Sequence, residues 1–180
     1  MKAIGIDLAG LATNPSGFAI LEERKFKTQV VHTDEQITYL CIINNPDIVA
    51  IDAPLSLPRR GSLRKADFSL IKRGLRVFPP RFGGMLLLTA RGIRLAEKLR
   101  SNKIKVIEVH PRTSGLLLFK TGDRKQWLAQ LRRDGFSFKG AESRHEIDAV
   151  MAAVTGLLYL KNKVEEVGAQ DEGTIIIPKG

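Results

Sequence analysis

The sequence contains a single cysteine, Cys41, among its 180 residues. One cysteine excludes a disulfide within the chain and also excludes a cysteine-rich zinc site. Because Cys41 lies among apolar residues, we expect it to be packed and unreactive. Carboxylates, histidines and basic side chains are therefore the groups to consider for chemistry.

Long apolar runs are also missing from the sequence. The uncharged stretch from Ala149 to Leu160 is too short to span a bilayer. No secretory signal precedes the first predicted strand, which begins almost at Met1. We therefore expect a soluble, cytoplasmic protein without a membrane partner.

Acidic residues are outnumbered by basic ones. The chain has 29 Lys and Arg against 19 Asp and Glu, which gives a formal net charge of +10. This balance favours polyanionic partners such as nucleic acid, either DNA or RNA, and the alternative is a solvated basic surface that serves solubility. With 43% hydrophobic residues the chain can bury a core. Its length fits one domain, residues 1–180, with an insertion at about 54–84.

The apolar patterns predict strands and helices in alternation. The stretch KAIGIDLAG, residues 2–10, predicts a strand buried on both faces. Strands at 17–22 and 26–32 then predict an antiparallel meander. The remaining predictions are helices at 33–43, 62–73, 85–100, 124–133 and from 143 onward, and strands at 47–51, 103–109 and 174–177.

Basic side chains are concentrated in the segment from Pro54 to Gly84. They suit phosphate contacts, and Phe68, Phe78 and Phe82 among them are available for stacking on bases. The alternative is a solvated basic helix whose phenylalanines pack against the body of the protein, and for the phenylalanines we favour it. The basic residues predicted to bind substrate are Arg59, Arg60, Arg64, Lys65, Arg73 and Arg81.

Acidic residues stand at the ends of two predicted buried strands. Asp7 and Asp52 each follow a run of apolar residues, where an unpaired carboxylate is costly. In an open α/β sheet, sites form beyond the carboxyl ends of the strands. A third acid, Asp148, follows His145 by three residues, so the two side chains share one face of the last predicted helix. Its alternative role is a favourable charge near a helix N-terminus.

Carboxylates that meet in one place repel one another and take up protons unless a cation is present. Mg²⁺ or Mn²⁺ prefers carboxylate oxygen, and two such ions can flank a scissile phosphate. Glu108 is a predicted fourth ligand, or holds a metal-bound water, unless it pairs with Arg112 or another base. The predicted catalytic residues and metal ligands are Asp7, Asp52, Asp148 and His145, the last as ligand or proton carrier.

The start of the last predicted helix has the spacing of a capping box. Ser143 stands at the N-cap position and Glu146 three residues later. We expect Glu146 to be a cap first, and a supporting residue beside the predicted ligands second.

Five stretches of the sequence together resemble a known family: GIDLAG, AIDAPLSLP, RKAD, EVHP and HEIDAVMAA. They are similar to the DUF429 family of predicted nucleases with a ribonuclease H-like fold. The pair His145 and Asp148 is also similar to the last motif of some RuvC-type Holliday junction resolvases. The family commonly has paired acids just before the Asp of this motif, where this chain has Arg144 and His145.

The resemblance implies an α/β fold with a mixed five-stranded sheet flanked by helices. Its first three strands would be antiparallel, and its first, fourth and fifth strands parallel. The resemblance also implies metal roles for the three aspartates with a histidine beside them. Arg64, Asp67 and Glu108 fall in recurrent motifs of the family, which implies that they line the site.

These features predict a metal-dependent nuclease, a hydrolase in which water attacks the phosphorus of nucleic acid. The alternative is a non-catalytic module that binds nucleic acid or a protein partner on the same fold. A phosphotransferase that uses ATP is less expected, because residues 5–10 only faintly resemble a phosphate loop and Leu11 replaces its usual small hydroxyl residue. The oligomeric state is open, with a homodimer as one arrangement.

Overall fold

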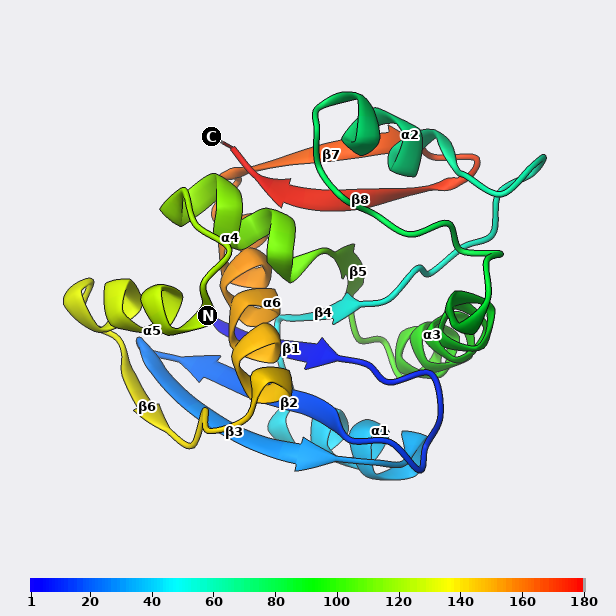
Figure 1. Cartoon of the computed structure of the whole chain (residues 1–180). Helices are drawn as coiled ribbons and strands as arrows, with labels where there is room; N and C mark the ends of the chain where they lie inside the picture. The colour runs from blue at the N-terminus through cyan, green and yellow to red at the C-terminus, as the bar shows by residue number, and fades with distance from the viewer. Residues whose placement is uncertain (180) are drawn as a thin grey trace.

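One mixed sheet of eight strands runs through the part of the chain that the computed structural model describes, residues 1–179 (Figure 1). The strand order is β6-β3-β2-β1-β4-β5-β8-β7. The strands are β1 (Lys2–Asp7), β2 (Ser16–Glu22), β3 (Lys25–Val31), β4 (Ile48–Asp52), β5 (Val106–Val109), β6 (Ser137–Lys139), β7 (Val164–Ala169) and β8 (Gly173–Pro178). The helices are α1 (Asp34–Asn44), α2 (Lys65–Lys72), α3 (Gly84–Ser101), α4 (Pro111–Phe119), α5 (Arg124–Arg133) and α6 (Arg144–Leu160).

The central strand β1 pairs antiparallel with β2 and parallel with β4. Beyond these neighbours, β3 extends the antiparallel part and β5 extends the parallel part. This arrangement confirms the predicted topology of the first five strands. Because β1 and β4 are parallel and in register, Asp7 lies directly beside Asp52 at one end of the sheet.

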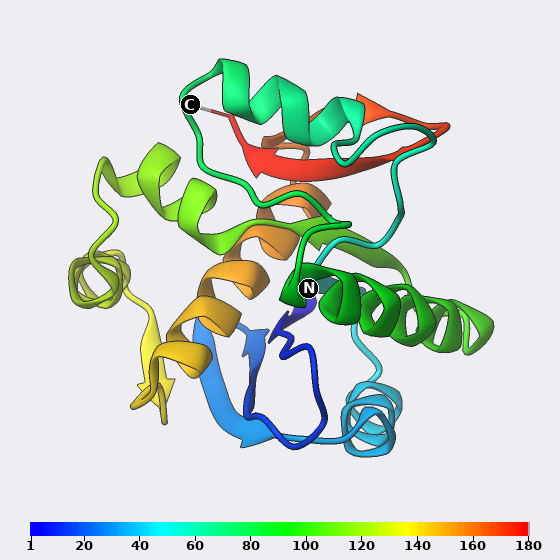
Figure 2. The same ribbon diagram turned by 45° about the vertical axis from the view of Figure 1, so that its right-hand side comes forward.

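Helices cover both faces of the sheet, with α6 on one face and α1 and α3 on the other (Figure 2). Successive residues of β1 point to these two layers in turn. Ile4 and Ile6 belong to the core formed with α1 and α3, whereas Ala3 belongs to the core formed with Ala152 of α6. The same alternation directs Asp7 to the face that α6 covers.

Two glycines let α6 lie very close to the sheet. A Cβ atom on Gly5 of β1 would clash with the backbone of Ala149, and one on Gly17 of β2 would clash with the backbone of His145. Gly17 is also the register partner of Asp7. The absence of these two side chains therefore brings the first turns of α6 against the end of β1.

Most predicted elements are found within a few residues of their predicted bounds, and the exceptions have local causes. β6 has only three residues, and β7 has the mostly polar sequence VEEVGA, so neither was predicted. α4 was also missed, because His110-Pro111 was interpreted only as a turn. Pro111 is the first residue of this helix, a position that proline favours. The sheet is therefore wider than the predicted five strands.

Two expectations drawn from what the sequence lacks can be compared with the structure. Cys41 is fully buried, and burial raises the pKa of its thiol to about 12, which confirms a packed and unreactive cysteine. Within residues 1–179, none of the helices combines the length and the apolar character that a membrane span requires.

Candidate active site

A pocket of about 250 Å³ opens at the carboxyl ends of β1, β4 and β5. Its walls include Asp7 from β1, Asp52 from β4 and Asp148 from α6. The parallel register of the two strands brings the first two acids together, and the close packing of α6 brings the third. The structure thus gathers the three predicted acids in one place, and their roles stay predictions.

Asp7 is paired with the predicted histidine. The Nδ1 atom of His145 lies 2.7 Å from Oδ2 of Asp7, so the ring N–H can donate to the carboxylate. Burial raises the pKa of Asp7 above its ordinary value, and the hydrogen bond with His145 partly opposes this rise. The pair joins β1 to the first turn of α6, and of the two residues only Asp7 is among those that line the pocket.

Asp52 is the acid of the three whose charge is least compensated. Within residues 1–179 it has no hydrogen bond and no ion pair, whereas Asp7 and Asp148 each have one basic partner. Burial, followed by the charges of Asp7 and Asp148, raises the pKa of Asp52 well above its ordinary value. The carboxyl ends of β1 and β4 therefore carry negative charge that the protein itself leaves partly unbalanced.

Asp148 is held by an arginine that the sequence analysis did not single out. The Nε and Nη2 atoms of Arg124, the first residue of α5, donate to its two carboxylate oxygens at 2.8 and 2.6 Å. The two residues are 24 positions apart in the sequence. Since Arg124 was interpreted only as the start of a predicted helix, no local pattern indicated this contact.

Two of the predicted metal ligands, Asp148 and Glu108, are paired with arginines instead. Among residues 1–179, no three His, Cys, Asp or Glu side chains are arranged to hold a metal ion. Arg124 takes up both oxygens of Asp148, and Arg64 takes up both oxygens of Glu108. The ligand set predicted from the sequence is thus not assembled in this conformation.

The donor chemistry of the pocket nevertheless fits a divalent cation. Asp7 and Asp52 stand side by side, and burial, followed by the charges of neighbouring acids, raises the pKa of each carboxyl, so the ionised forms are disfavoured without a cation. A hard cation with oxygen ligands removes such repulsion. The two strand-end aspartates therefore present oxygen donors of the kind that a divalent cation prefers, while both oxygens of Asp148 accept hydrogen bonds from Arg124.

Arg64 forms a buried network with Glu108 and Asp67. Its side chain is 1% exposed and donates to both oxygens of Glu108 at 2.7 and 2.6 Å, and to both oxygens of Asp67 at 3.1 and 2.8 Å. Burial would lower the pKa of Arg64, but these hydrogen bonds raise it overall, so the network is charged. The N–H of Leu55 also donates to Glu108, at 2.8 Å.

This network corrects two sequence predictions. Arg64 is not a surface contact for substrate phosphate, because its guanidinium is buried and fully occupied by acids. Glu108 is not a free metal ligand, and the alternative of an acid paired with a base is found, with Arg64 in place of Arg112. Both residues and Asp67 do line the pocket, as the resemblance implied.

Glu146 is a capping residue, as the spacing predicted. Ser143 accepts a hydrogen bond from the N–H of Glu146, and the Glu146 carboxylate accepts from the N–H of Ser143 at 3.0 Å. The other carboxylate oxygen accepts from the Oγ1 of Thr28 at 2.7 Å, which ties α6 to β3. Glu146 therefore supports the site by fixing the start of the helix that carries His145 and Asp148.

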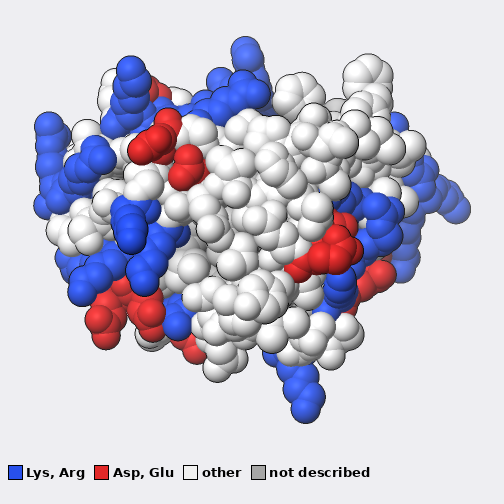
Figure 3. All heavy atoms as spheres, turned by 90° about the horizontal axis from the view of Figure 1, so that it is seen from below, with Lys and Arg blue, Asp and Glu red and all other residues white. Residues whose placement is uncertain are grey.

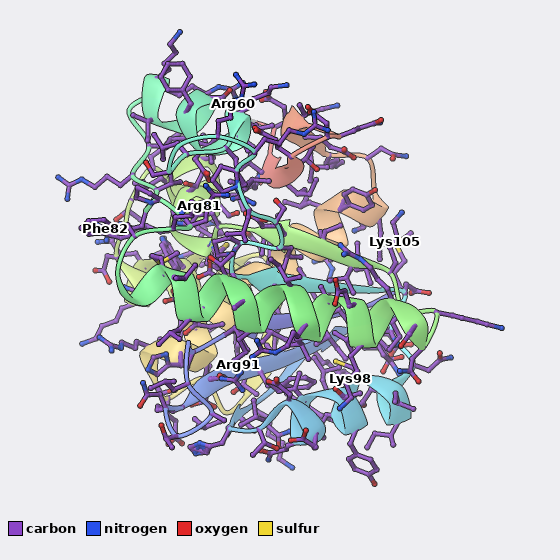
Figure 4. The ribbon with its side chains drawn as sticks, turned by 90° about the vertical axis from the view of Figure 1, so that its right-hand side faces the viewer. Arg60, Arg81, Phe82, Arg91, Lys98 and Lys105 are labelled. Carbon is purple, nitrogen blue, oxygen red and sulfur yellow. The ribbon has the colours of Figure 1, made fainter. Side chains whose placement is uncertain are left out.

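The other predicted substrate-binding residues lie on the surface. Arg59 and Lys65 are paired with Asp171, and Arg73 with Glu165, in exposed ion pairs of the kind that contributes little to stability. Arg60 is exposed, and Arg81 donates to the carbonyls of Pro58 and Gly61. Figure 4 shows Arg81 on the side of the start of α3, and Arg60 farther from that helix, near α2 at the top of the view. On the face drawn in Figure 3, Lys and Arg lie around the margin rather than in one patch.

The preferred interpretation of the three phenylalanines was wrong. Phe68, Phe78 and Phe82 are 51%, 68% and 71% exposed, so they are not packed against the body of the protein. Phe78 also lines the pocket that holds the acids. Phe78 is followed directly by Pro79 and Pro80, which restrict the backbone of this segment.

Comparison with protein families matches residues 5–172 to DUF429, described as a protein of unknown function. This chain belongs to the DUF429 family. The matched range includes all three aspartates and the basic segment. None of the curated proteins is significantly similar to the DUF429 chain in sequence.

Solved structures of RuvC share the fold of this DUF429 chain. Thermus thermophilus RuvC in complex with a Holliday junction substrate has a TM-score of 0.59 at 15% identity, over 90% of this chain and 96% of that one. A second structure of Thermus thermophilus RuvC has a TM-score of 0.55 at 16% identity, with the same coverage. The DUF429 chain therefore has the ribonuclease H-like fold, as its sequence indicated.

One further residue of the pocket was overlooked in the sequence. His110 lines the pocket, and its Nδ1 atom lies 2.7 Å from the Oγ1 of Thr113. Burial, with a smaller effect from Arg112, lowers the pKa of His110 to about 4, so its ring is neutral at neutral pH. The EVHP stretch had marked this position within the DUF429 resemblance, without a role.

The raised pKa of Asp52 predicts a pH-dependent gain in stability for Asp52→Asn. At a pH below the pKa of Asp52 in the unfolded protein, this carboxyl is protonated in both the folded and the unfolded state, so its ionisation does not change the stability. As pH rises above that value the folded state binds more protons than the unfolded state, so wild-type stability falls. Asp52→Asn should therefore raise Tm in EDTA at pH 7.5, by about 2–4 °C for each kcal/mol relieved, and the gain should vanish near pH 3.5. Thermal denaturation at both pH values measures this, and a gain of equal size at both would contradict it.

The buried network predicts that Arg64→Ala will destabilise the protein strongly. Loss of the guanidinium leaves two buried carboxylates without their partner, at a cost of about 3–5 kcal/mol. The matched control is Arg60→Ala on the exposed loop, which should change the free energy of unfolding by about 0.5 kcal/mol or less. Urea denaturation of both variants tests the assignment, and an equally mild effect for the two would return Arg64 to the substrate-binding set.

Proposed function

We propose that this protein is a metal-dependent nuclease that hydrolyses phosphodiester bonds of nucleic acid. The observation that carries the proposal is the convergence of three aspartates, from β1, β4 and α6, in one pocket of a RuvC-like fold. A protein that only binds polyanions gains nothing from a partly uncompensated negative cluster, because that cluster repels phosphate. In a cation-dependent reaction the same carboxylates would bind the metal ion.

Asp7, Asp52 and Asp148 would hold Mg²⁺ or Mn²⁺ in this proposal. When bound, the cation would activate water and stabilise the charge that develops on the phosphate. His145 would hold or move a proton through its ring, and its Nδ1 contact with Asp7 fixes the ring beside that carboxylate. Arg64 would keep the surrounding wall rigid through its pairs with Glu108 and Asp67.

Exposed basic and aromatic side chains between residues 59 and 82 support nucleic acid as the substrate class. The exposed arginines and lysine would contact phosphates, since their present ion pairs are weak and solvent-accessible. Phe78 and Phe82 offer exposed rings on which unpaired bases can stack. The basic residues in question are Arg59, Arg60, Lys65, Arg73 and Arg81.

One observation favours the second candidate, a non-catalytic module that binds nucleic acid. Arg124 occupies both oxygens of Asp148, so the three aspartates are not free to act together in this conformation. In a pure binder this ion pair would be permanent and would serve only to neutralise the pocket. Addition of Mn²⁺ distinguishes the candidates, because a pure binder should gain neither thermal stability nor cleavage.

The deciding experiment is a panel of branched, single-stranded and duplex DNA and RNA substrates assayed with Mg²⁺, with Mn²⁺ and with EDTA. We expect cleavage of at least one substrate in the presence of metal and none in EDTA. Asp52→Asn should lower the rate by at least about 100-fold, because several kcal/mol of charge stabilisation are lost. Glu97→Gln, which makes the same carboxyl-to-amide change at an exposed site on α3, is the control and should retain full activity. Absence of metal-dependent cleavage on every substrate would leave the binding module as the better account.

The basic loop predicts a change in the salt dependence of nucleic-acid binding. The double variant Arg59→Ala/Arg60→Ala should weaken duplex binding and reduce the slope of log K against log salt by about 1.8, which corresponds to two phosphate contacts. Lys161→Ala/Lys163→Ala removes the same charge beyond the far end of α6 and should leave the slope unchanged. Fluorescence anisotropy over a salt series measures both slopes. Equal slopes for wild type and the loop variant would mean that these arginines are merely solvated.

A further inference from the structure

Arg124 occupies an unusual place for a basic residue. It is the first residue of α5, and it lies in the pocket with the three aspartates. A cation at a helix N-terminus is disfavoured by the helix dipole. Its two hydrogen bonds to Asp148 offset that cost, so the acids of the pocket, and not α5, account for the presence of this guanidinium.

The geometry allows Arg124 to change partners without unfolding any element. Its side chain is 36% exposed, and its guanidinium lies 5.7 Å from the centre of the buried ring of Trp127. The pair is bidentate and Asp148 is buried, so a competitor is needed to displace Arg124, but the Arg124 side chain is open to solvent and therefore accessible to exchange. Arg64 shows the contrast, because it is 1% exposed and locked between two acids.

The excess of negative charge in the pocket favours the exchange of Arg124 for a cation at Asp148. One guanidinium does not neutralise three carboxylates, and Asp52 has no partner within residues 1–179. A divalent cation that binds beside Asp7 and Asp52 competes with Arg124 for the oxygens of Asp148. Once released, the guanidinium remains in the pocket with its fork of donors free, and that fork matches phosphate oxygens as well as carboxylate oxygens.

We propose that Arg124 exchanges partners, holding Asp148 in the metal-free protein and binding a phosphate of the substrate once Asp148 ligates the cation. This inference rests on the proposed function, because it concerns the same pocket and the same substrate class. It assigns Arg124 to phosphate binding, and it links cation binding to nucleic-acid binding through one side chain.

The first test compares nucleic-acid binding by wild type and by Arg124→Met with and without a cation. The probe is a fluorescein-labelled single-stranded oligonucleotide, measured by anisotropy in EDTA and in Ca²⁺, a hard cation that also takes oxygen ligands. In EDTA the two proteins should bind equally, because Arg124 is engaged with Asp148. In Ca²⁺ the variant should bind about tenfold more weakly than wild type, because one charge-assisted contact is lost. Lys125→Met, one residue along α5 and exposed, is the control and should match wild type in both buffers.

The second test measures Mn²⁺ affinity by calorimetry in the absence of nucleic acid. Arg124→Met should bind Mn²⁺ about tenfold more tightly than wild type, because the competing guanidinium is gone. Arg124→Lys keeps the charge but loses the fork and should lie between the two, and it serves if the methionine variant fails to fold.

Two results would overturn the exchange. One is an equal loss of oligonucleotide affinity in EDTA and in Ca²⁺, which would make Arg124 an ordinary phosphate contact. The other is Mn²⁺ affinity that is unchanged or weaker in Arg124→Met. Both measurements are independent of turnover, so an absence of cleavage by wild type would remove the nuclease proposal and leave this inference to be decided by binding alone.

Discussion

The parallel, in-register pairing of β1 with β4 is the constraint on which the site depends. It sets Asp7 and Asp52 on adjacent strands, about 4.8 Å apart along the hydrogen-bonding direction, with both side chains on one face. Small residues on that face of β1 let α6 approach until its backbone touches the sheet. The same close packing that buries the core therefore brings a third acid to the pair.

The acids of the pocket differ in how far basic partners neutralise them, and this difference separates structural acids from candidates for chemistry. Glu108 is matched by the buried Arg64, Asp148 by the half-exposed Arg124, and Asp7 by His145. Asp52 is matched by nothing within residues 1–179. Buried ion pairs that serve only the fold are usually fully satisfied, whereas carboxylates left with few partners in an open pocket are typical of functional sites. The wall around Arg64 is thus structural, and the acids at the strand ends are candidates for chemistry.

The fold and the pocket support the nuclease proposal in different ways. The likeness to RuvC, at 15–16% identity, concerns the fold, and one fold can serve many activities. The argument for chemistry comes from the pocket, where acids and two differently held arginines lie with the exposed ring of Phe78. An exposed aromatic surface next to an anionic pocket suits a substrate that carries both bases and phosphates.

The sequence by itself determined the order of the main elements, the strands that end in Asp7 and Asp52, and the capping box at Ser143 and Glu146. These depend on periodicity, apolar runs and short-range spacing, which are local properties of the chain. Only the tertiary structure decided the partners of the charges. Arg124 meets Asp148 across 24 residues and Arg64 meets Glu108 across 44, and nothing local distinguishes them from the exposed Arg60. Whether an arginine faces solvent or a buried acid depends on which surfaces pack together, and for that reason the sequence showed that the segment is basic but not that Arg64 is buried between two acids.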